Sequence, residues 1–177
     1  MNARHGPLHS TLMPPYTGID TLRVATYNIH KGVRGVGPRK RLEIHNLGLA
    51  VEAFDADLVF LQEVQGLNER HALRFAGWPG EPQHEFLAGE DFDHAYGRNR
   101  VHEYGHHGNA VLSRFPIVAH ENADVSNHRF ERRGLLHCVL APAGWGRELH
   151  CVCVHLSLHE RGRRRQLEAI GERVSQL

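Results

Sequence analysis

The chain has 177 residues, of which 41% are apolar and 23% charged, and its formal charge is +1 with histidine neutral. This length suits one domain with a real core, and the apolar content argues against a disordered chain. A dedicated nucleic-acid-binding domain usually carries a clear basic excess, so the near-neutral charge argues against one. A nuclease is not excluded, because a metal ion can supply positive charge at a substrate phosphate.

Residues 1–20 contain His, Pro, Gly and Ser but no apolar stretch of the signal-peptide kind, and we expect them to form a flexible leader to a domain over 21–177. The sequence has no run of about 18 apolar residues, so no membrane span is expected. Cys138, Cys151 and Cys153 lie on apolar segments. An odd number of such cysteines is typical of reduced, packed thiols, which predicts a cytoplasmic protein.

The first half of the chain predicts a β-α-β start. A β-type run over 22–29 precedes a loop rich in Gly and Pro over 33–40. Apolar residues then recur at helical spacing over 41–54. Residues 57–64 hold an unbroken apolar run, which is typical of a strand covered on both faces. The stretch 66–91 is broken by Gly, Pro and charge, and predicts a short helix plus loop.

The second half predicts strands and a closing helix. Strand-like segments cover 111–113, 117–125, 134–140 and 147–156, with turns that contain Pro and Gly between them. Residues 159–177 again place apolar side chains at helical spacing. A β-α-β start, a run of hairpin-like strands and a helix together predict an α/β fold, with a mixed sheet and helices packed on it.

Three polar residues stand at the ends of predicted strands. Glu63 offers a carboxylate, which is costly to bury alone and is a natural ligand for Mg²⁺ or Mn²⁺. Asn28 ends a strand that should lie parallel to the strand of Glu63, so both would emerge at the same edge of the sheet. His155 can orient a nucleophile when neutral or stabilise a phosphorane when charged. Each also has an ordinary explanation, as a strand-end acid, a loop-capping amide or a hydrogen-bonded histidine.

Two arginines near strand ends, Arg114 and Arg133, can grip phosphate bidentately or pair with surface acids. A separate possibility is a transition-metal site made by His102, His106 and His107. Adjacent residues in a strand point to opposite faces, so His106 and His107 cannot bind the same metal ion, which counts against this site.

Five motifs occur in a fixed order along the chain: Thr26–His30 (TYNIH), Leu61–Val64 (LQEV), Gly108–Pro116 (GNAVLSRFP), Glu131–Gly134 (ERRG) and Val154–Leu156 (VHL). This series resembles the endonuclease/exonuclease/phosphatase superfamily with the DNase I-like fold. His30–Gly32 and Gly105–Ala110 resemble, more narrowly, a group of uncharacterised bacterial members. The resemblance covers residues 22–177.

The resemblance implies a DNase I-like α/β sandwich, which has four αββα layers in the complete family fold and would be incomplete here, with mixed sheets and flanking helices. It implies a hydrolase of phosphodiesters or phosphomonoesters that uses Mg²⁺ or Mn²⁺. Glu63 would be a direct metal ligand, Asn28 would orient the metal and the scissile phosphate, and His155 would contact a phosphate oxygen. Substrates of the superfamily include nucleic acids, phospholipid headgroups and inositol phosphates.

Four further residues are carried over with weaker roles. His30 follows Asn28 and is expected to touch the site. Asn109, Arg114 and Arg133 are expected to support the loops and strands or to contact phosphate at the rim.

Two family motifs are absent from these 177 residues, Gly-Asp-x-Asn and Ser-Asp-His. The family uses them for the aspartate that activates water and for an aspartate–histidine pair. We therefore expect the chain to be the amino-terminal part of such a domain, inactive by itself, within an intact protein that is a monomer. The alternative is a non-catalytic binding lobe with the same fold.

Overall fold

The computed structural model describes residues 21–127 and 130–176, so the leader expected over 1–20 lies outside the described residues. The described elements are, in chain order, β1 (Val24–Asn28), η1 (His30–Gly32), β2 (Val33–Arg34), η2 (Gly37–Arg39), β3 (Arg41–Leu42), α1 (Ile44–Ala53), β4 (Leu58–Asn68), α2 (Glu69–Arg74), α3 (Gln83–Ala88), β5 (Asp93–His102), β6 (Gly105–Ser113), β7 (Ile117–Asp124), β8 (Gly134–Leu140), β9 (Leu149–Val154) and α4 (Glu160–Val174).

The strands form two main sheets. The first has the order β1-β4-β6-β5, in which β1 and β4 are parallel and the other pairs antiparallel. The second is the antiparallel sheet β7-β8-β9, and β2 with β3 makes a small separate ribbon. The parallel pairing predicted for the first two strands is confirmed, with Asn28 opposite Gln62.

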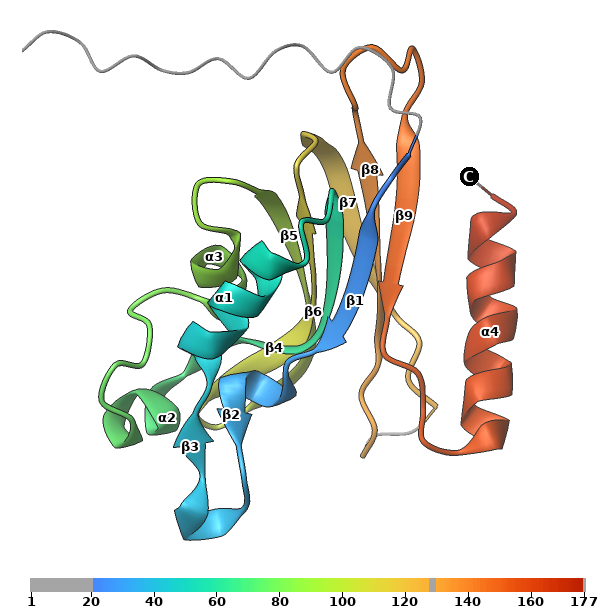
Figure 1. Cartoon of the computed structure of the whole chain (residues 1–177). Helices are drawn as coiled ribbons and strands as arrows, with labels where there is room; N and C mark the ends of the chain where they lie inside the picture. Colours follow the sequence, from blue (N-terminus) through green and yellow to red (C-terminus); the bar gives the residue numbers. More distant parts are fainter. Residues whose placement is uncertain (1–20, 128–129, 177) are drawn as a thin grey trace, which may run out of the picture.

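The elements stack in layers (Figure 1). Helices α1 and α3 cover one face of the four-stranded sheet, the three-stranded sheet packs on its other face, and α4 lies beyond β9. Arg173 of α4 pairs with Glu121 of β7, which ties this helix to the second sheet. The described part of the chain thus has the helix-sheet-sheet-helix order that the resemblance implies for the complete family fold, with two main sheets where the residue pattern alone predicted one mixed sheet.

Strand β4 has apolar cores on both sides. Val59 and Leu61 are buried against α1 and α3, whereas Leu58 and Phe60 pack toward the second sheet. Successive residues of a strand point to opposite faces, so a strand between two layers needs an unbroken apolar run. The expectation of a doubly covered strand is confirmed.

The three cysteines lie in the core between the two sheets and are free thiols. Cys151 and Cys153 share a face, as their spacing predicts, and Cys138 stands opposite Cys151 in the β8-β9 ladder. Burial raises the pKa of Cys153 to about 12, so this thiol stays protonated and unreactive.

The structure also differs from the sequence-based elements. Strand β4 continues to Asn68, α1 begins at Ile44 because Arg41–Leu42 pairs with β2, and two short helices stand within 66–91. Strand β5 and the start of β6 were missed because they lack apolar alternation. In β5, an inward position is occupied by Gly97, which packs against the Asn122 side chain, where a larger apolar residue would not fit. Within the described residues, no helix is long and apolar enough to cross a membrane.

Candidate functional site

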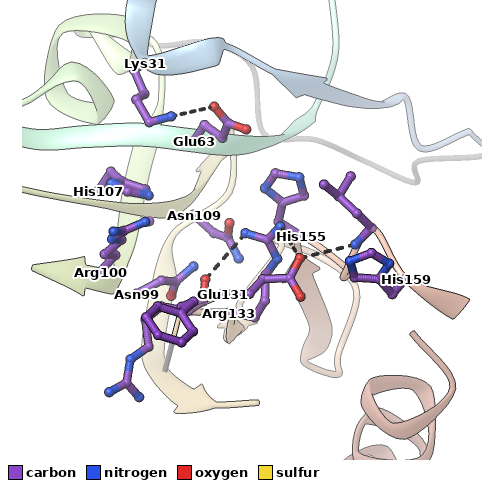
Figure 2. Close-up of a pocket in the computed structure, with 14 residues that line it drawn as sticks. Lys31, Glu63, Asn99, Arg100, His107, Asn109, Glu131, Arg133, His155 and His159 are labelled. Atoms are coloured by element: carbon purple, nitrogen blue, oxygen red, sulfur yellow. Dashed lines mark hydrogen bonds and ion pairs between the residues drawn. The ribbon is translucent and has the colours of Figure 1, made fainter. Parts of the chain in front are cut away.

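Residues from both sheets and their loops line a cavity of about 400 Å³ (Figure 2). Lys31 and Glu63 form one wall, and Glu131, Arg133 and His155 lie across from them. The full lining is Lys31, Glu63, Asn99, Arg100, His107, Gly108, Asn109, Phe130, Glu131, Arg132, Arg133, His155, Leu158 and His159.

Glu63 does not end its strand, which corrects the sequence-based placement. It lies inside β4 at a bulge, where the register with β6 shifts between Leu61 and Val64. Its φ of 57° is in the left-handed region, which costs a residue other than glycine on the order of 1 kcal/mol or more. The bulge lets the carboxylate leave the plane of its neighbours and face the cavity, a common use of bulges near functional sites.

Two donors hold the Glu63 carboxylate. Asn28 Nδ2 donates to Oε1 at 3.3 Å, and Lys31 Nζ donates to Oε2 at 3.1 Å. Burial raises the pKa of Glu63, but the Lys31 charge and the hydrogen bonds from Lys31 and Asn28 outweigh it, so the pKa is lowered. Glu63 is therefore an ionised, half-buried carboxylate, and its meeting with Asn28 is as the sequence predicts.

Asn28 and His30 stand behind Glu63 and line a neighbouring cavity of about 510 Å³, whose wall also includes Lys31 and Glu63. Asn28 Oδ1 accepts the His30 backbone N–H at 3.0 Å. The His30 ring is 74% exposed, and its Nδ1 lies 3.9 Å from Glu63 Oε2. His30 thus touches the site at its edge.

A buried amide fixes the two segments that carry Lys31 and Glu63. Gln83 of α3 is 1% exposed; its Nε2 donates to the Lys31 carbonyl at 3.0 Å, and its Oε1 accepts the Gln65 N–H at 2.9 Å.

The backbone of Lys31 is in the left-handed region, with a φ of 64°. Of the four residues other than glycine with positive φ in the described part of the chain, three are His30, Lys31 and Glu63. Strained backbone gathers at this site, where surrounding contacts hold it in place.

His155 follows β9 and faces the same cavity. Burial and then the Arg133 charge lower its pKa, although Glu63 opposes this, so the imidazole is neutral at neutral pH. Arg133 donates to Glu131 Oε1 at 3.1 Å, and its buried Nε has no hydrogen-bond partner among the described residues. A neutral imidazole beside a partly satisfied guanidinium suits an anionic ligand.

Asn109 is 1% exposed and supports both sheets. Its Nδ2 donates to the carbonyls of Gly134 and Cys153 at 3.1 and 3.3 Å. Its Oδ1, which is buried, has no partner within the described residues, and neither has Nδ1 of His107. Burial, then the charges of Lys31 and Arg100, lower the pKa of His107 to about 4. The cavity thus holds several polar atoms that a ligand or water would satisfy.

Arg114 is not part of this site. Its Nε donates to the Ala56 carbonyl at 3.1 Å, and its guanidinium lies over the Phe92 ring, near the start of β4, whereas the Glu63 bulge is in the middle of that strand. Of the two roles expected for Arg114, the structure agrees with support of the strand, and the side chain is not in the cavity lining where a phosphate contact would place it. Arg114 follows Ser113, the last residue of β6, which pairs with Leu58 at the start of β4. Arg114 therefore supports the start of β4.

The histidines considered for transition-metal binding do not converge. His106 Nδ1 lies 3.0 Å from the Tyr96 hydroxyl, whereas His107 faces the cavity. In the part of the chain that the structure describes, no group of three or more His, Cys, Asp or Glu residues could hold a metal ion. A histidine-based transition-metal site therefore has no support.

No role at this cavity was expected for several of its residues: Lys31, Asn99, Arg100, His107, Glu131 and His159. Three of them carry a sequence signal, because they lie in the segments His30–Gly32, Gly105–Ala110 and Glu131–Gly134 that resemble the family: Lys31, His107 and Glu131. The others are Asn99 and Arg100 of β5 and His159 just before α4, and no local pattern marks them.

The oxygen donors at the cavity fit Mg²⁺ or Mn²⁺ better than zinc. Glu63 supplies a carboxylate and Asn109 an amide oxygen, whereas Asn28 turns its Nδ2 toward Glu63 and its Oδ1 already accepts the His30 N–H. Mg²⁺ keeps several waters and needs only one or two protein carboxylates, whereas zinc favours Cys and His. Glu63 would hold such an ion, with Asn28 beside it.

The sequence model described as "Endonuclease/Exonuclease/phosphatase family" matches residues 25–175. The chain belongs to this family. The match includes all the motifs that carry Asn28, Glu63 and His155.

Other proteins resemble the chain in sequence or in fold. "Uncharacterized protein YbhP" of Escherichia coli K12 is 45% identical over 166 residues, which cover 93% of this chain and 65% of YbhP. A family protein of Leptotrichia buccalis has a TM-score of 0.63 at 16% identity, covering 86% of this chain and 63% of that one. Humanized TDP2 of D. rerio has a TM-score of 0.56 at 15% identity, covering 87% and 56%. At these identities the solved structures establish the DNase I-like fold alone.

Proposed function

We propose that the chain carries the metal- and phosphate-binding part of a divalent-metal-dependent phosphoesterase. The observation that carries this proposal is the Glu63 carboxylate, aimed from a strained bulge into a cavity that also holds Arg100, Arg133 and His155. One carboxylate suits a hydrated Mg²⁺ or Mn²⁺, and the cations and imidazole opposite suit a phosphate ester. Membership of the family supports the same chemistry.

Each group has a role in this proposal. Asn28 and the bulge hold Glu63 toward the ion, and His155 donates to a phosphoryl oxygen as a neutral imidazole. Arg133 stabilises charge that develops on the phosphate. Mg²⁺ would neutralise charge on the phosphoryl oxygens while water attacks in line. The substrate we propose is a phosphodiester or phosphomonoester of a nucleic acid, a phospholipid headgroup or an inositol phosphate.

Turnover is proposed for the intact protein. The chain spans 65% of YbhP, and the one carboxylate that it offers to a metal ion at the cavity is Glu63. The test is hydrolysis of a panel of phosphodiesters and phosphomonoesters by the intact protein with Mg²⁺ or Mn²⁺. Glu63→Gln should lower the rate by about a hundredfold or more, as expected when one charge-stabilising group leaves an active site. It should leave the melting temperature nearly unchanged.

Glu52→Gln, on the exposed side of α1, is the matched control and should keep the wild-type rate. Wild-type turnover in Glu63→Gln would contradict the role of this carboxylate. An intact protein that binds Mg²⁺ and phosphate but hydrolyses no ester would favour the alternative of a non-catalytic binding lobe.

A further inference from the structure

The ammonium of Lys31 already stands where a cation is expected. Its Nζ lies 3.1 Å from Glu63 Oε2, and the two side chains are 38% and 22% exposed. The pair faces both the main cavity and its neighbour. A cation that binds Glu63 must therefore compete with Lys31 for the same oxygen.

We propose that Lys31 is an exchangeable counter-ion of Glu63, which yields the carboxylate to a divalent cation and moves to a phosphate oxygen of the bound ligand. This inference rests on the proposed metal site and adds a positioning role for Lys31. The partial exposure of the side chain leaves room for its ammonium to move.

The residue type supports exchange over a permanent ion pair. Only two of the 21 Lys and Arg residues are lysines, Lys31 and Lys40, so lysine at this position stands out against the chain's own preference for arginine. Arginine would hold the carboxylate with a rigid two-pronged fork, whereas lysine is a point charge on a flexible stem. A lysine can thus be displaced with little rearrangement of the backbone.

The base of the Lys31 stem is fixed even though its ammonium can move. Gln83 binds the Lys31 carbonyl and, through its other atom, the Gln65 N–H in the strand that carries Glu63. The left-handed backbone at Lys31, with φ of 64°, is thereby held against the Glu63 bulge. This geometry keeps the ammonium within reach of the site in both states.

An anionic ligand is the acceptor that the cavity leaves for a displaced ammonium. The other acidic side chain in the cavity lining, Glu131, already accepts hydrogen bonds from Arg133 at 3.1 Å and from the Ser157 hydroxyl at 2.6 Å. Arg100 and Arg133 line the same cavity, so the displaced ammonium would share it with like charges once Glu63 binds a metal. A phosphate relieves this repulsion.

The first test is Mn²⁺ binding to the full chain, measured from the loss of the electron paramagnetic resonance signal of free Mn²⁺. Lys31→Met should bind Mn²⁺ about tenfold tighter than wild type, because no charged hydrogen bond must be broken first. Lys31→Asn, a residue type that tolerates a left-handed backbone, should do the same if Lys31→Met folds poorly. Lys40→Met removes the same charge without a Glu63 contact and should change the affinity less than about twofold. Lys31→Arg should bind no tighter than wild type.

The second test is calorimetric binding of inorganic phosphate at saturating Mn²⁺, which should be about fivefold weaker in Lys31→Met and unchanged in Lys40→Met. Unchanged or weaker Mn²⁺ binding by Lys31→Met and Lys31→Asn would overturn the exchange. If Glu63→Gln abolishes Mn²⁺ binding while Lys31→Met and Lys31→Asn leave it at the wild-type affinity, the exchange fails and the metal site stands. Absence of Mn²⁺ binding by wild type and Lys31→Met alike would overturn both, and unchanged phosphate affinity would overturn the move to phosphate.

Discussion

At the residue scale, the cavity walls depend on side chains that bond to the backbone of distant strands. Asn109 of β6 is the clearest case, because its amide donates to the carbonyls of Gly134 at the start of β8 and of Cys153 near the end of β9. Both carbonyls belong to the second sheet, so one side chain joins the two layers beside the site. Replacing such a donor with an acceptor should lower the free energy of unfolding.

Asn109→Asp tests this role. An ionised aspartate would face two carbonyl oxygens without a proton to donate, so the free energy of unfolding at pH 7 should fall by about 3 kcal/mol. The loss should be smaller at pH 4, because burial raises the pKa of the new carboxyl and its protonated form can donate. Urea unfolding at both pH values measures this. Asn122→Asp, which replaces an exposed donor to the Arg98 carbonyl, should cost less than about 1 kcal/mol; an equal loss would contradict the argument.

At the element scale, two helices fix loops through buried glutamines. Gln83 at the start of α3 joins the Lys31 carbonyl to the Gln65 N–H. Gln166 of α4 does the same for the Ser157 N–H and the Val125 carbonyl, at 2.7 and 3.2 Å. Both glutamines are 1% exposed. These helices therefore position irregular backbone near the cavity as well as covering apolar faces.

Gln83→Leu should lower the free energy of unfolding by about 2 to 4 kcal/mol, because it leaves the Lys31 carbonyl and the Gln65 N–H buried without partners. Chemical denaturation measures the loss. Hydrogen exchange should show faster exchange of the Gln65 amide, while the Ser157 amide, which Gln166 holds, keeps its wild-type rate. Unchanged protection of Gln65 would show that Gln83 does not fix this segment.

At the scale of the whole molecule, buried neutral histidines couple stability to pH. His84 stacks on Tyr96 with ring centroids 4.6 Å apart, and burial lowers its pKa from 6.5 to about 4. Burial likewise lowers the pKa of His107 to about 4. Between pH 6.5 and pH 4 these histidines bind more protons in the unfolded chain than in the folded chain. Their contribution to the free energy of unfolding is therefore present above pH 6.5 and is lost as pH falls toward 4.

His84→Phe should weaken this acid sensitivity. The ring keeps its stacking on Tyr96 but no longer titrates, so the fall in unfolding free energy between pH 6.5 and 4 should shrink by up to about 3 kcal/mol. Guanidinium unfolding at a series of pH values measures the slope. A variant with the full wild-type slope would show that His84 is not a source of it.

Much of the fold follows from local pattern. The apolar run of β4 predicts its two-sided burial, and helical spacing predicts α1 and α4. One helix between two strands predicts their parallel pairing, and hence the meeting of Asn28 with Glu63. Strand β5 was missed because its inward positions are small, a requirement set by the facing sheet and not by the strand itself.

The sequence by itself determined the main helices and strands, the family motifs and the parallel pairing that brings Asn28 to Glu63, because these depend on periodicity and short-range order. The layered sandwich was implied by the family resemblance. Only the tertiary structure decided the Glu63 bulge, the Lys31 ion pair and the exclusion of Arg114. The bulge arises from register between β4 and β6, and the ion pair from the Gln83 contacts of a separate helix. Such features depend on contacts between distant segments, and no local pattern encodes them.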